Sequence, residues 1–432
     1  KRLSGEPYFE THCAWVAMFL DNLVGNEAWT IAGLLHDSVE DSGESLARIR
    51  DHFPGPLGAE VAHIVDGVTK ISNPRDGSSR EIATLRKIAQ FRDPAVFVVK
   101  LADKSHNMLT LGHMPPAKQV QKATEVIRAY GKLAGILNCY RWRRWLEDMA
   151  FPYADPETFE HVRARIDPDP RLKLDFLNTM LEQLGRLMDR AGIDGRVELT
   201  VNGYWQTWQK LRRLAQMRRA SMHDFSAVND LISFRMIVAE ENIPACYVLL
   251  GEVNRFLGAY LDNKRFDDYI AVPQRGYRAL QVTAFMPEVG AIEVAIATED
   301  MEGENIWGVV YATKHGKDLS QYRPIEILTP TGGARFLVEG STVLDAVASI
   351  QQELLLDKIT AVEVNGSMAR LSDKVKPGDV VEVVTGPNRL TPTEEWLHYA
   401  NPTTTRNLRS VLATEAIRRA AEIGRREIRS VL

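Results

Sequence analysis

The hexapeptide His-Asp-Ser-Val-Glu-Asp at residues 36–41 is the feature that most restricts how this chain can fold. At 3.6 residues per helical turn, His36 lies above Glu40 and Asp37 lies above Asp41, so the spacing predicts one helix with these side chains on a shared face. Such a face can hold a divalent cation and position a water molecule beside it. The segment therefore predicts a metal site flanked by carboxylates.

Further candidate ligands lie on both sides of this segment. Asp103 and Asn107 are four residues apart in an apolar helical pattern, and His12 precedes the hexapeptide. Two imidazoles and two carboxylates form a mixed nitrogen and oxygen set, which suits Mn²⁺, Fe²⁺ or Zn²⁺ and leaves positions for water. The predicted metal ligands are His12, His36, Asp37 and Asp103.

Composition indicates a multidomain protein of the cytoplasm. The 432 residues leave room for about three domains, and no apolar run reaches the roughly 18 residues that span a bilayer. The three cysteines are far apart, which argues against a disulfide framework and indicates reduced thiols. A net charge of −4 is no nucleic-acid signature. Because the chain starts at Lys1 and not at Met, we expect natural residues upstream.

Periodicity changes along the chain and predicts its organisation. Residues 1–155 have helical spacing, and residues 156–195 read as a helical connector. Residues 196–318 contain strand-like runs between helical segments, which predicts an α+β domain. Residues 325–386 carry turn signals such as Asn365-Gly366, as expected of a small β-grasp module, and residues 387–432 open a helical segment.

Arginine is frequent in the C-terminal tail. Residues 403–432 hold seven arginines and three glutamates in a helical pattern. One interpretation is a helix that faces RNA. The other, which we favour, is a solvated helix with ion pairs such as Glu422 with Arg426.

Several motifs in order resemble one family. Residues 2–8, the hexapeptide 36–41 and residues 101–108 are similar to the HD hydrolase domain of the Rel/SpoT homologue family, the long alarmone enzymes that make and degrade (p)ppGpp. The similarity continues through residues 101–160, and residues 325–386 resemble the family's TGS domain. The resemblance implies an all-α HD-type metal hydrolase domain, an α+β nucleotidyltransferase-like synthetase domain, a small β-grasp TGS domain and a C-terminal helical segment.

The resemblance also implies roles for individual residues. His12, His36, Asp37 and Asp103 match the family's Mn²⁺ ligands, and Glu40 and Asp41 match its catalytic carboxylates. The implied reaction is 3′-pyrophosphohydrolysis of (p)ppGpp, which releases pyrophosphate and GDP or GTP. The positions that hold the guanosine part in relatives are matched by Arg2, Ser4, Asn107 and Thr110.

Two further features of this region need interpretation. Arg86 and Lys87 match a basic pair near the diphosphate, where a guanidinium can bind phosphate oxygens, although such a pair can equally belong to a solvated helix face. Three residues separate Tyr8 from His12, where relatives more often have two. We expect a local bulge to absorb the extra residue.

The middle domain has lost cations that synthetases use. The family's Arg-x-Lys-His positions, the lysine of Phe-Lys-Asp-Tyr, a lysine near Tyr277 and the arginine four residues after Glu293 are all replaced. Pyrophosphoryl transfer from ATP concentrates negative charge and needs cationic neutralisation. The domain is therefore predicted to keep the fold without the reaction, and Asp230 and Glu293 can form internal pairs near Arg235. The replaced positions are Thr200, Asn202, Gly203, Asp267, residues 273–276 and Ala297.

Alternatives remain open at this point. The chain can be a non-catalytic regulator that binds alarmone or a protein partner, or a hydrolase of adenine alarmones, since Arg2 and Asn107 favour guanine only weakly. The complete set of metal ligands and carboxylates favours hydrolysis. The TGS resemblance implies ribosome or tRNA sensing, but Gln351 replaces the histidine that relatives use near the tRNA end. No membrane partner is expected.

Overall fold

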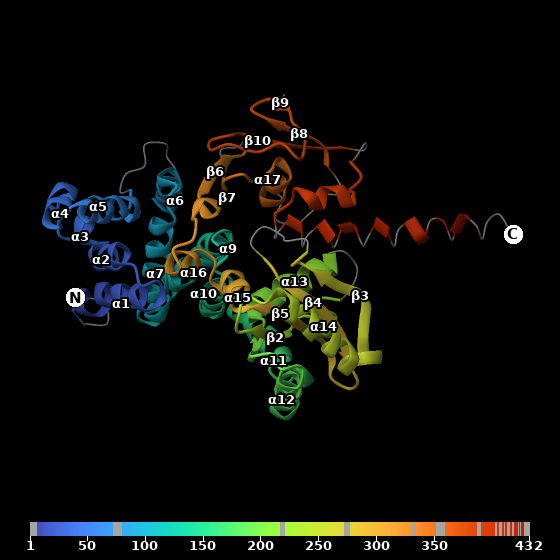
Figure 1. Cartoon of the computed structure of the whole chain (residues 1–432). Helices are drawn as coiled ribbons and strands as arrows, with labels where there is room; N and C mark the ends of the chain where they lie inside the picture. Colours follow the sequence, from blue (N-terminus) through green and yellow to red (C-terminus); the bar gives the residue numbers. More distant parts are fainter. Residues whose placement is uncertain are drawn as a thin grey trace. The chain divides into compact units, whose positions relative to one another are not determined.

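Two compact units make up the chain in a computed structural model. The structure describes residues 7–71, 80–216, 221–271, 277–330, 333–350, 359–386, 390–401 and, discontinuously, 404–426. One unit combines Lys1–Val65 with Val98–Lys317, and the other combines Asp66–Phe97 with Asp318–Leu432 (Figure 1). No helix in the described ranges is long and apolar enough to cross a membrane. Several residues named above lie outside the described ones: Arg2, Ser4, 273–276, Gln351 and Glu422.

The first unit opens with a close-packed helical hairpin. Gly25 at φ +69° ends the first helix, and the Asn26 side chain caps the second by accepting a hydrogen bond from the Trp29 amide. Gly33 lets the two helices approach, since a Cβ there would lie 2.6 Å from a Leu20 methyl carbon. The helices of this region are α1 (Ala14–Leu23), α2 (Glu27–Leu35), α3 (Ser38–Asp41), α4 (Leu46–His52), α5 (Pro56–Val68) and α7 (Pro94–Leu109).

The predicted single helix through residues 36–41 is wrong, because α2 ends at Leu35 and α3 begins at Ser38. His36 Nδ1 lies 2.7 Å from the Gly33 carbonyl, and Ser38 Oγ donates to the Leu35 carbonyl at 2.6 Å. The side chains of His36 and Ser38 therefore occupy backbone carbonyls that would otherwise accept the main-chain hydrogen bonds of a continuous helix. The Asp41 amide still donates to the Asp37 carbonyl at 2.8 Å, so the helical spacing resumes after the break.

More helices follow α7 in the same unit and lead into a sheet. Trp142 on α10 donates from its indole to Ser105 of α7 at 2.7 Å, which ties these two helices together. These helices are α8 (Pro116–Glu125), α9 (Gly131–Ile136), α10 (Tyr140–Ala154), α11 (Pro156–Ile166), α12 (Leu174–Ala191), α13 (Tyr204–Gln216), α14 (Ile243–Leu257), α15 (Glu299–Trp307) and α16 (Val309–Lys314).

The five-stranded sheet has the order β1-β2-β5-β4-β3, and only the β2–β5 pair is parallel. The strand-like runs predicted from sequence are confirmed as β2 (Ile232–Val238), β4 (Leu280–Met286) and β5 (Gly290–Thr298). Strands β1 (Gly195–Val201) and β3 (Leu261–Asp268) were not predicted. This sheet confirms the α+β character of the middle domain.

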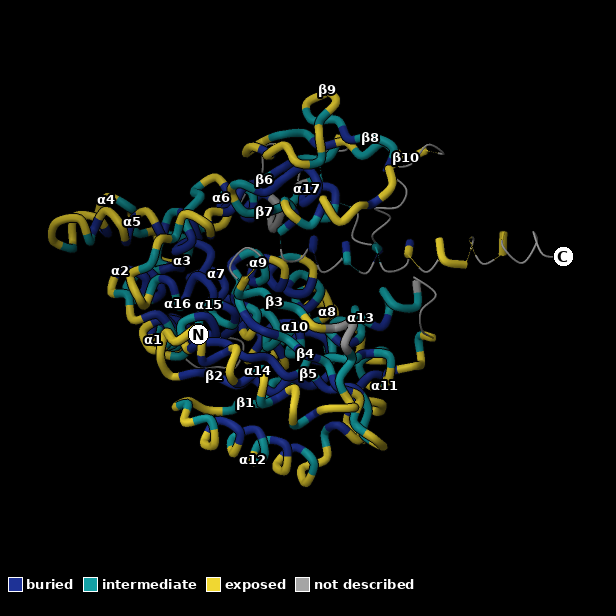
Figure 2. The backbone as a smooth tube through the Cα atoms, turned by 45° about the vertical axis from the view of Figure 1, so that its right-hand side comes forward, coloured by how far each residue is buried: buried dark blue, intermediate teal, exposed yellow. Residues whose placement is uncertain are grey.

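Helices α12 and α14 pack on one another and against the sheet. Leu177, Met180, Leu184 and Leu187 give α12 a buried stripe at three- and four-residue spacing, and the helix alternates between buried and exposed along its length in Figure 2. The apolar side chains of β2 and β5 are buried as well.

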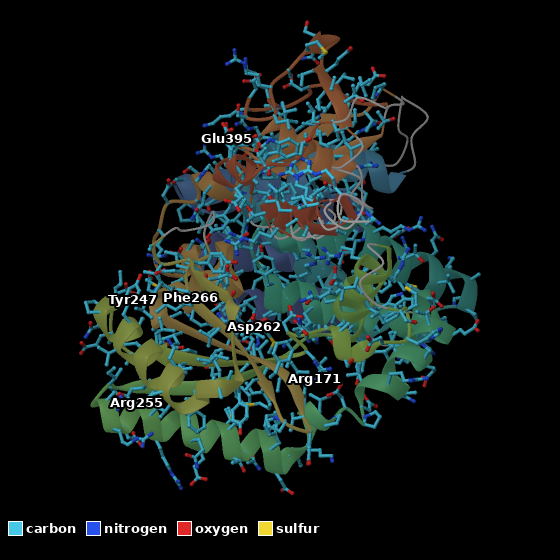
Figure 3. All side chains as sticks on the ribbon, turned by 90° about the vertical axis from the view of Figure 1, so that its right-hand side faces the viewer. Arg171, Tyr247, Arg255, Asp262, Phe266 and Glu395 are labelled. Carbon is cyan, nitrogen blue, oxygen red and sulfur yellow. The ribbon has the colours of Figure 1, made fainter. Side chains whose placement is uncertain are left out.

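Arg171 and Tyr247, both labelled in Figure 3, make polar contacts that hold loops of this domain. Arg171 is buried and donates to the backbone carbonyls of Val228 and Phe225 while it pairs with Asp169. The Tyr247 hydroxyl donates to Asp268 at the end of β3, with an O–O distance of 3.0 Å. A fully paired buried guanidinium fixes the loop that precedes β2.

The second unit is a small β-grasp core with one helix of the N-terminal region beside it. Asn365 and Gly366, at φ +54° and +75°, form the predicted two-residue hairpin turn. Ile325, Leu344 and Val381 belong to its buried core. Its elements are α6 (Arg80–Phe91), β6 (Pro324–Leu328), β7 (Ala334–Val338), α17 (Val343–Ile350), β8 (Ile359–Val364), β9 (Ser367–Met368) and β10 (Val381–Thr385).

The observed architecture confirms the predicted fold class, with a helical N-terminal part, an α/β middle part and a small module with short sheets. The boundaries predicted for the individual domains stay predictions. Residues 66–97 group with the β-grasp module in the second unit, because α6 packs against β6 and β7.

Candidate metal centre

A π-helical turn places the first predicted ligand. The turn η1 (Phe9–Cys13) runs directly into α1, and the Ala14 amide donates to the Phe9 carbonyl five residues earlier. A π-turn adds one residue to a helix without breaking it. It therefore accommodates the extra residue between Tyr8 and His12, and His12 is 1% exposed inside the unit.

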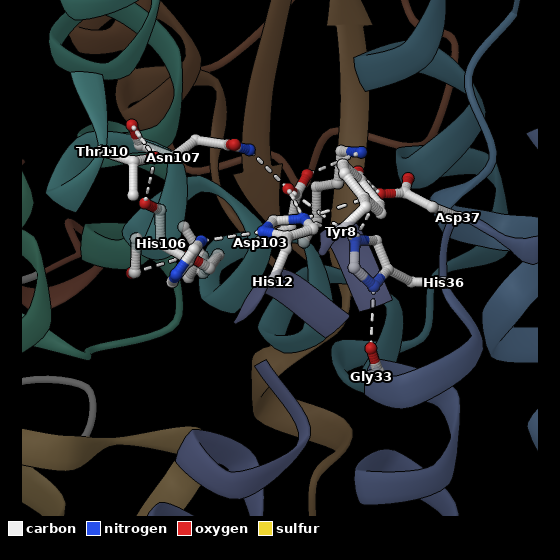
Figure 4. Close-up of polar contacts among 12 residues, drawn as sticks. Tyr8, His12, Gly33, His36, Asp37, Asp103, His106, Asn107 and Thr110 are labelled. Carbon is white, nitrogen blue, oxygen red and sulfur yellow. Dashed lines mark hydrogen bonds and ion pairs between the residues drawn. The ribbon is translucent and has the colours of Figure 1, made fainter. Parts of the chain in front are cut away.

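Four donor side chains converge at this point, as Figure 4 shows. His12 Nε2 lies 3.2 Å from His36 Nε2 and 3.4 Å from an Asp103 oxygen. An Asp37 oxygen lies 3.5 Å from His12 Nε2 and 3.0 Å from His36 Nε2. All four side chains are buried. The structure thus brings together the four residues that the sequence predicted as metal ligands.

These spacings fit a shared metal ion. Two ligands held about 2.0–2.2 Å from one ion lie roughly 2.8–3.6 Å apart at octahedral or tetrahedral angles. The imidazole and carboxylate donors here are separated by 3.0 to 3.8 Å. His12, His36 and Asp103 alone already form a buried group whose donor atoms lie within 4.8 Å of one another.

Hydrogen bonds behind the donors fix their orientation. His36 uses Nδ1 toward the Gly33 carbonyl, so its Nε2 is directed at the centre. His12 Nδ1 lies 2.9 Å from His106 Nδ1, and Asn107 donates to Asp103 at 2.6 Å. Because Nδ1 of His12 and of His36 is engaged in these contacts, Nε2 of each ring is directed at the other candidate ligands.

The charges at the centre favour a cation. Burial alone would raise the pKa of Asp103, but Lys100, 3.1 Å from the carboxylate, and His12 hold that pKa well below its usual value. Burial also opposes ionisation of Asp37, yet hydrogen bonds with His12 and His36 lower its pKa below the usual range. Burial lowers the pKa of His12, and both carboxylates more than reverse this and raise it. The centre therefore keeps its carboxylates ionised and attracts positive charge.

The other predicted site residues are placed less centrally. Glu40 is partly buried and Asp41 is exposed on α3, directly after Asp37. Asp41 acts electrostatically on the Tyr8 hydroxyl, whose pKa is raised by burial, by Asp37 and, to a smaller extent, by Asp41. Thr110 donates from its hydroxyl to the His106 carbonyl at the end of α7.

Arg86 and Lys87 belong to the second unit, where other groups engage their side chains. Arg86 Nε pairs with Glu326 on β6 at 3.0 Å. Lys87 Nζ pairs with Asp66 at 2.8 Å and contacts the Thr69 carbonyl at 3.3 Å. Neither side chain belongs to the solvated helix face that was the alternative interpretation.

Sequence reasoning missed three residues that support the ligands. Tyr8 donates its hydroxyl to Asp37, Lys100 pairs with Asp103, and His106 contacts His12. A helical signal existed for two of them, because Lys100 and His106 are three residues before and after Asp103 on α7. Tyr8 stands in no such spacing to Asp37.

Family models match three stretches of the chain. An HD domain matches residues 1–139, a region found in RelA / SpoT proteins matches residues 201–315, and a TGS domain matches residues 325–385. The buried His and Asp centre lies in the first stretch and the five-stranded sheet lies largely in the second.

Several curated relatives match almost the whole length of this chain. A probable GTP pyrophosphokinase of Mycobacterium leprae is 30% identical over 99% of this chain and 59% of its own length. A guanosine-3′,5′-bis(diphosphate) 3′-pyrophosphohydrolase of Aquifex aeolicus is 28% identical over 94% of this chain and 61% of its own length. The bifunctional (p)ppGpp synthase/hydrolase RelA of Mycobacterium tuberculosis is 30% identical over 99% of this chain and 63% of its own length.

The chain belongs to the Rel/SpoT homologue family. It spans about three fifths of the length of these relatives, whose names include synthesis, hydrolysis or both. In this Rel/SpoT homologue the HD domain implies a divalent metal, and the buried donors described above fit one.

The synthetase-like domain holds its retained acids in internal contacts. Asp230 pairs with Lys210, and Glu293 on β5 accepts a hydrogen bond from Ser233 on β2 at 2.8 Å. Loss of solvent raises the pKa of Glu293, and the nearby Asp230 adds to the increase. Arg235 is buried and forms a two-pronged pair with Glu302. The predicted internal pairing is therefore present, although Arg235 pairs with a helix acid that was not foreseen.

Proposed function

We propose that this chain is a metal-dependent (p)ppGpp 3′-pyrophosphohydrolase that releases pyrophosphate and GDP or GTP. The observation that carries the proposal is the buried set of two imidazoles and two carboxylates with donor spacings of 3.0 to 3.8 Å. This set lies within the stretch that matches an HD domain. Pyrophosphohydrolases and bifunctional enzymes occur among the relatives.

The proposed ion is Mn²⁺, held by His12, His36, Asp37 and Asp103. When bound, it supplies Lewis-acid stabilisation of phosphate charge and lowers the pKa of water. The protein's contribution begins with the low pKa of both ligand carboxylates, which keeps them ready to bind without losing a proton. The hydrogen bond between His12 and His106 and the one from His36 to the Gly33 carbonyl hold the imidazoles in place.

Glu40 and Asp41 are the proposed acid and base groups. Both lie on the short helix α3, which begins directly after the proposed ligand Asp37. Their side chains are therefore within about one helical turn of that ligand. In this proposal their carboxylates orient the attacking water and accept its proton. A partly buried Glu40 is the stronger candidate for the base, because an enclosed carboxylate holds a water molecule more rigidly than an exposed one.

The substrate contacts rest on the family resemblance. Asn107 and Thr110 are proposed to contact the guanosine part together with Arg2 and Ser4. Asn107 is partly buried and donates to Asp103, so its side chain lies where it could contact a substrate bound next to the metal ligands.

We also infer that the synthetase-like domain does not synthesise alarmone. Lys210 is paired with Asp230, and Arg235 is paired with Glu302. Two cations that a triphosphate could use are therefore already neutralised by acids of the domain itself. Pyrophosphoryl transfer depends on such cations.

The test is to incubate the purified chain with ppGpp and Mn²⁺ and to separate the products by chromatography. We expect GDP and pyrophosphate. Asp103→Ala is expected to lose both metal and turnover, whereas Glu40→Gln keeps the metal and loses activity by about two to four orders of magnitude. Glu44→Gln is the matched control, since Glu44 pairs with Arg48 on the surface.

Two outcomes would contradict the proposal. Recovery of intact ppGpp from a chain that still binds it would indicate a regulator that binds alarmone without turnover. Near wild-type activity of Glu40→Gln, with Mn²⁺ content unchanged, would remove Glu40 from the role of base.

A further inference from the structure

A cysteine sits beside the metal donors and creates a second donor set. Cys13 follows His12 in the π-turn η1, and its side chain is 5% exposed. Donor atoms of Cys13, His36 and Asp37 all lie within 4.8 Å of one another, and all three residues are buried. His36 therefore belongs both to this group and to the group with His12 and Asp103.

The two other cysteines provide an internal comparison. Cys139 and Cys246 are also buried and in no disulfide. Cys139 Sγ lies 3.1 Å from the Trp307 carbonyl, and Cys246 Sγ lies 4.0 Å from the Asn242 carbonyl. Among the cysteines of the described ranges, Cys13 alone is in a group with metal-ligating side chains. Burial by itself therefore does not account for its surroundings.

We propose that the centre contains two overlapping metal sites, and that a thiophilic divalent cation binds to Cys13, His36 and Asp37. The first set offers nitrogen and oxygen donors only, which suits a harder ion such as Mn²⁺. The second adds sulfur, which selects Zn²⁺, Cd²⁺ or Co²⁺ more strongly. This inference rests on the metal centre of the proposed function and extends it to a second class of cation.

The geometry requires only a small adjustment. Sulfur and nitrogen or oxygen ligands of a tetrahedral zinc ion lie roughly 3.3–3.8 Å apart, so donors that lie within 4.8 Å of one another have at most about 1.5 Å to close. Rotation about the single χ1 of Cys13 can supply that movement. On binding, the Cys13 S–H bond breaks, the sulfur lone pair goes to the ion and the proton leaves to solvent; no electron is transferred.

Sharing of His36 has a consequence for stoichiometry. His36 Nδ1 is engaged with the Gly33 carbonyl, which leaves only Nε2 for a metal ion. Because one imidazole nitrogen cannot serve two ions, the two sites exclude each other, and total metal is one ion per chain. A thiophilic cation then displaces Mn²⁺ instead of adding to it. The arrangement gives the hydrolase centre a competitive sensitivity to thiophilic metals.

Cobalt is the probe for the first test. Metal-free full-length chain is titrated with Co²⁺, and the near-ultraviolet sulfur-to-cobalt charge-transfer absorption is recorded. We expect this absorption in the wild type, Cys139→Ser and Cys246→Ser, and its loss in Cys13→Ser. Equal absorption in the wild type and Cys13→Ser, or none in the wild type, would overturn the proposal.

A competition experiment gives the second measurement. Mn²⁺ is displaced by Cd²⁺ and followed by the electron paramagnetic resonance of free Mn²⁺. The Cd²⁺ concentration needed for half displacement is expected to rise about tenfold or more in Cys13→Ser, while Mn²⁺ affinity itself changes little. Unchanged displacement by Cd²⁺ would contradict sulfur ligation.

Retained Mn²⁺ binding shows that Cys13→Ser is folded. If that variant does not fold, X-ray absorption of the wild-type Zn²⁺ complex decides the question, because a sulfur neighbour supports the proposal and a purely nitrogen and oxygen shell overturns it. None of these measurements uses ppGpp. A chain with the cobalt–sulfur absorption but no hydrolysis would therefore contradict the proposed function and leave this inference standing.

Discussion

His12 is held in the metal centre by a second histidine. Its Nδ1 lies 2.9 Å from His106 Nδ1, and the His106 ring packs against Trp15 with 4.9 Å between ring centroids. Only one proton can lie between these two nitrogens. The contact therefore fixes the His12 ring and directs its Nε2 toward His36 and Asp103.

Replacement of His106 tests this positioning role. His106→Phe keeps a ring but removes the nitrogen, and we expect Mn²⁺ affinity to fall about 10- to 100-fold, measured by electron paramagnetic resonance titration. His106→Asn restores a polar atom near the same position and is expected to recover most of the affinity. His113→Phe, at an exposed histidine, is the control. Equal affinity in all three variants would show that His106 only fills space.

Asp148 gives a pH-dependent test of stability. Burial raises its pKa from 3.8 to about 6, against a hydrogen bond that it accepts from the Trp205 amide. Because the pKa of Asp148 is higher in the folded than in the unfolded state, the protonated carboxyl favours folding. This contribution to the free energy of unfolding is full below about pH 4 and is lost as the pH rises through about 6. Asp148→Asn, which keeps an acceptor for Trp205, is therefore expected to be more stable than the wild type by about 1 to 2 kcal/mol at pH 8.

The measurement is the thermal midpoint of both proteins at pH 4 and pH 8. The difference between them is expected at pH 8 and absent at pH 4. Asp189→Asn, on the exposed face of α12, is the control and should show no such pH dependence. A difference that is equal at both pH values would mean that packing, and not charge, is responsible.

At this scale the cluster of candidate ligands was predictable and its supporting contacts were not. His36, Asp37 and Asp103 stand in short motifs with a chemical meaning, so residue type and spacing selected them as candidates. Cys13 lies in the π-turn and Tyr8 lies directly before it. A π-turn cannot be recognised from the spacing of apolar residues in the sequence. Pairwise contacts between distant elements have no local signal.

Gly308 controls the junction of α15 and α16. It has φ +50° and ψ −120°, and a Cβ there would lie 2.1 Å from the Leu137 carbonyl oxygen at the end of α9. The following Val309 amide donates to that same carbonyl at 3.0 Å. Both backbone conformation and close approach therefore require glycine.

Gly308→Ala is expected to destabilise the first unit by about 3 kcal/mol or more, since backbone strain and overpacking each cost about 1–3 kcal/mol. Urea unfolding measures the change. Gly251→Ala on α14 is the matched control, because nothing lies within 4 Å of a Cβ there and helical alanine should stabilise by up to about 1 kcal/mol. Similar effects of the two substitutions would contradict the requirement at Gly308.

Buried strands with long apolar runs were predicted and a charged edge strand was not, while β1 was missed although Val197, Leu199 and Val201 alternate with polar residues. The buried strands β2 and β5 read clearly as strands, whereas β3 contains Asp262, Lys264 and Asp268 and lies at the edge of the sheet. Charged edge strands lack the alternation that identifies a strand. The helix through residues 36–41 failed for another reason, because side-chain contacts to the Gly33 and Leu35 carbonyls outweighed its helical spacing.

At the scale of the whole molecule, the metal donors and the retained acids of the synthetase-like sheet lie in different domains. The metal donors sit in a helical region with ionised carboxylates, while the synthetase-like sheet has Glu293 and Asp230 in internal contacts. Glu293 is hydrogen-bonded within that sheet to Ser233. The sheet is therefore expected to act as a scaffold.

Glu293→Gln tests this separation. The amide can still accept from Ser233, so the sheet should fold, and kcat/KM for ppGpp hydrolysis with Mn²⁺ is expected to stay within about twofold of the wild type. Incubation of either protein with ATP and GDP is expected to give no alarmone, because the triphosphate finds Lys210 and Arg235 already paired with acids. Asp103→Ala is the positive control for loss of hydrolysis. Alarmone formed by the wild type and lost in Glu293→Gln would show an active synthetase and refute the scaffold role.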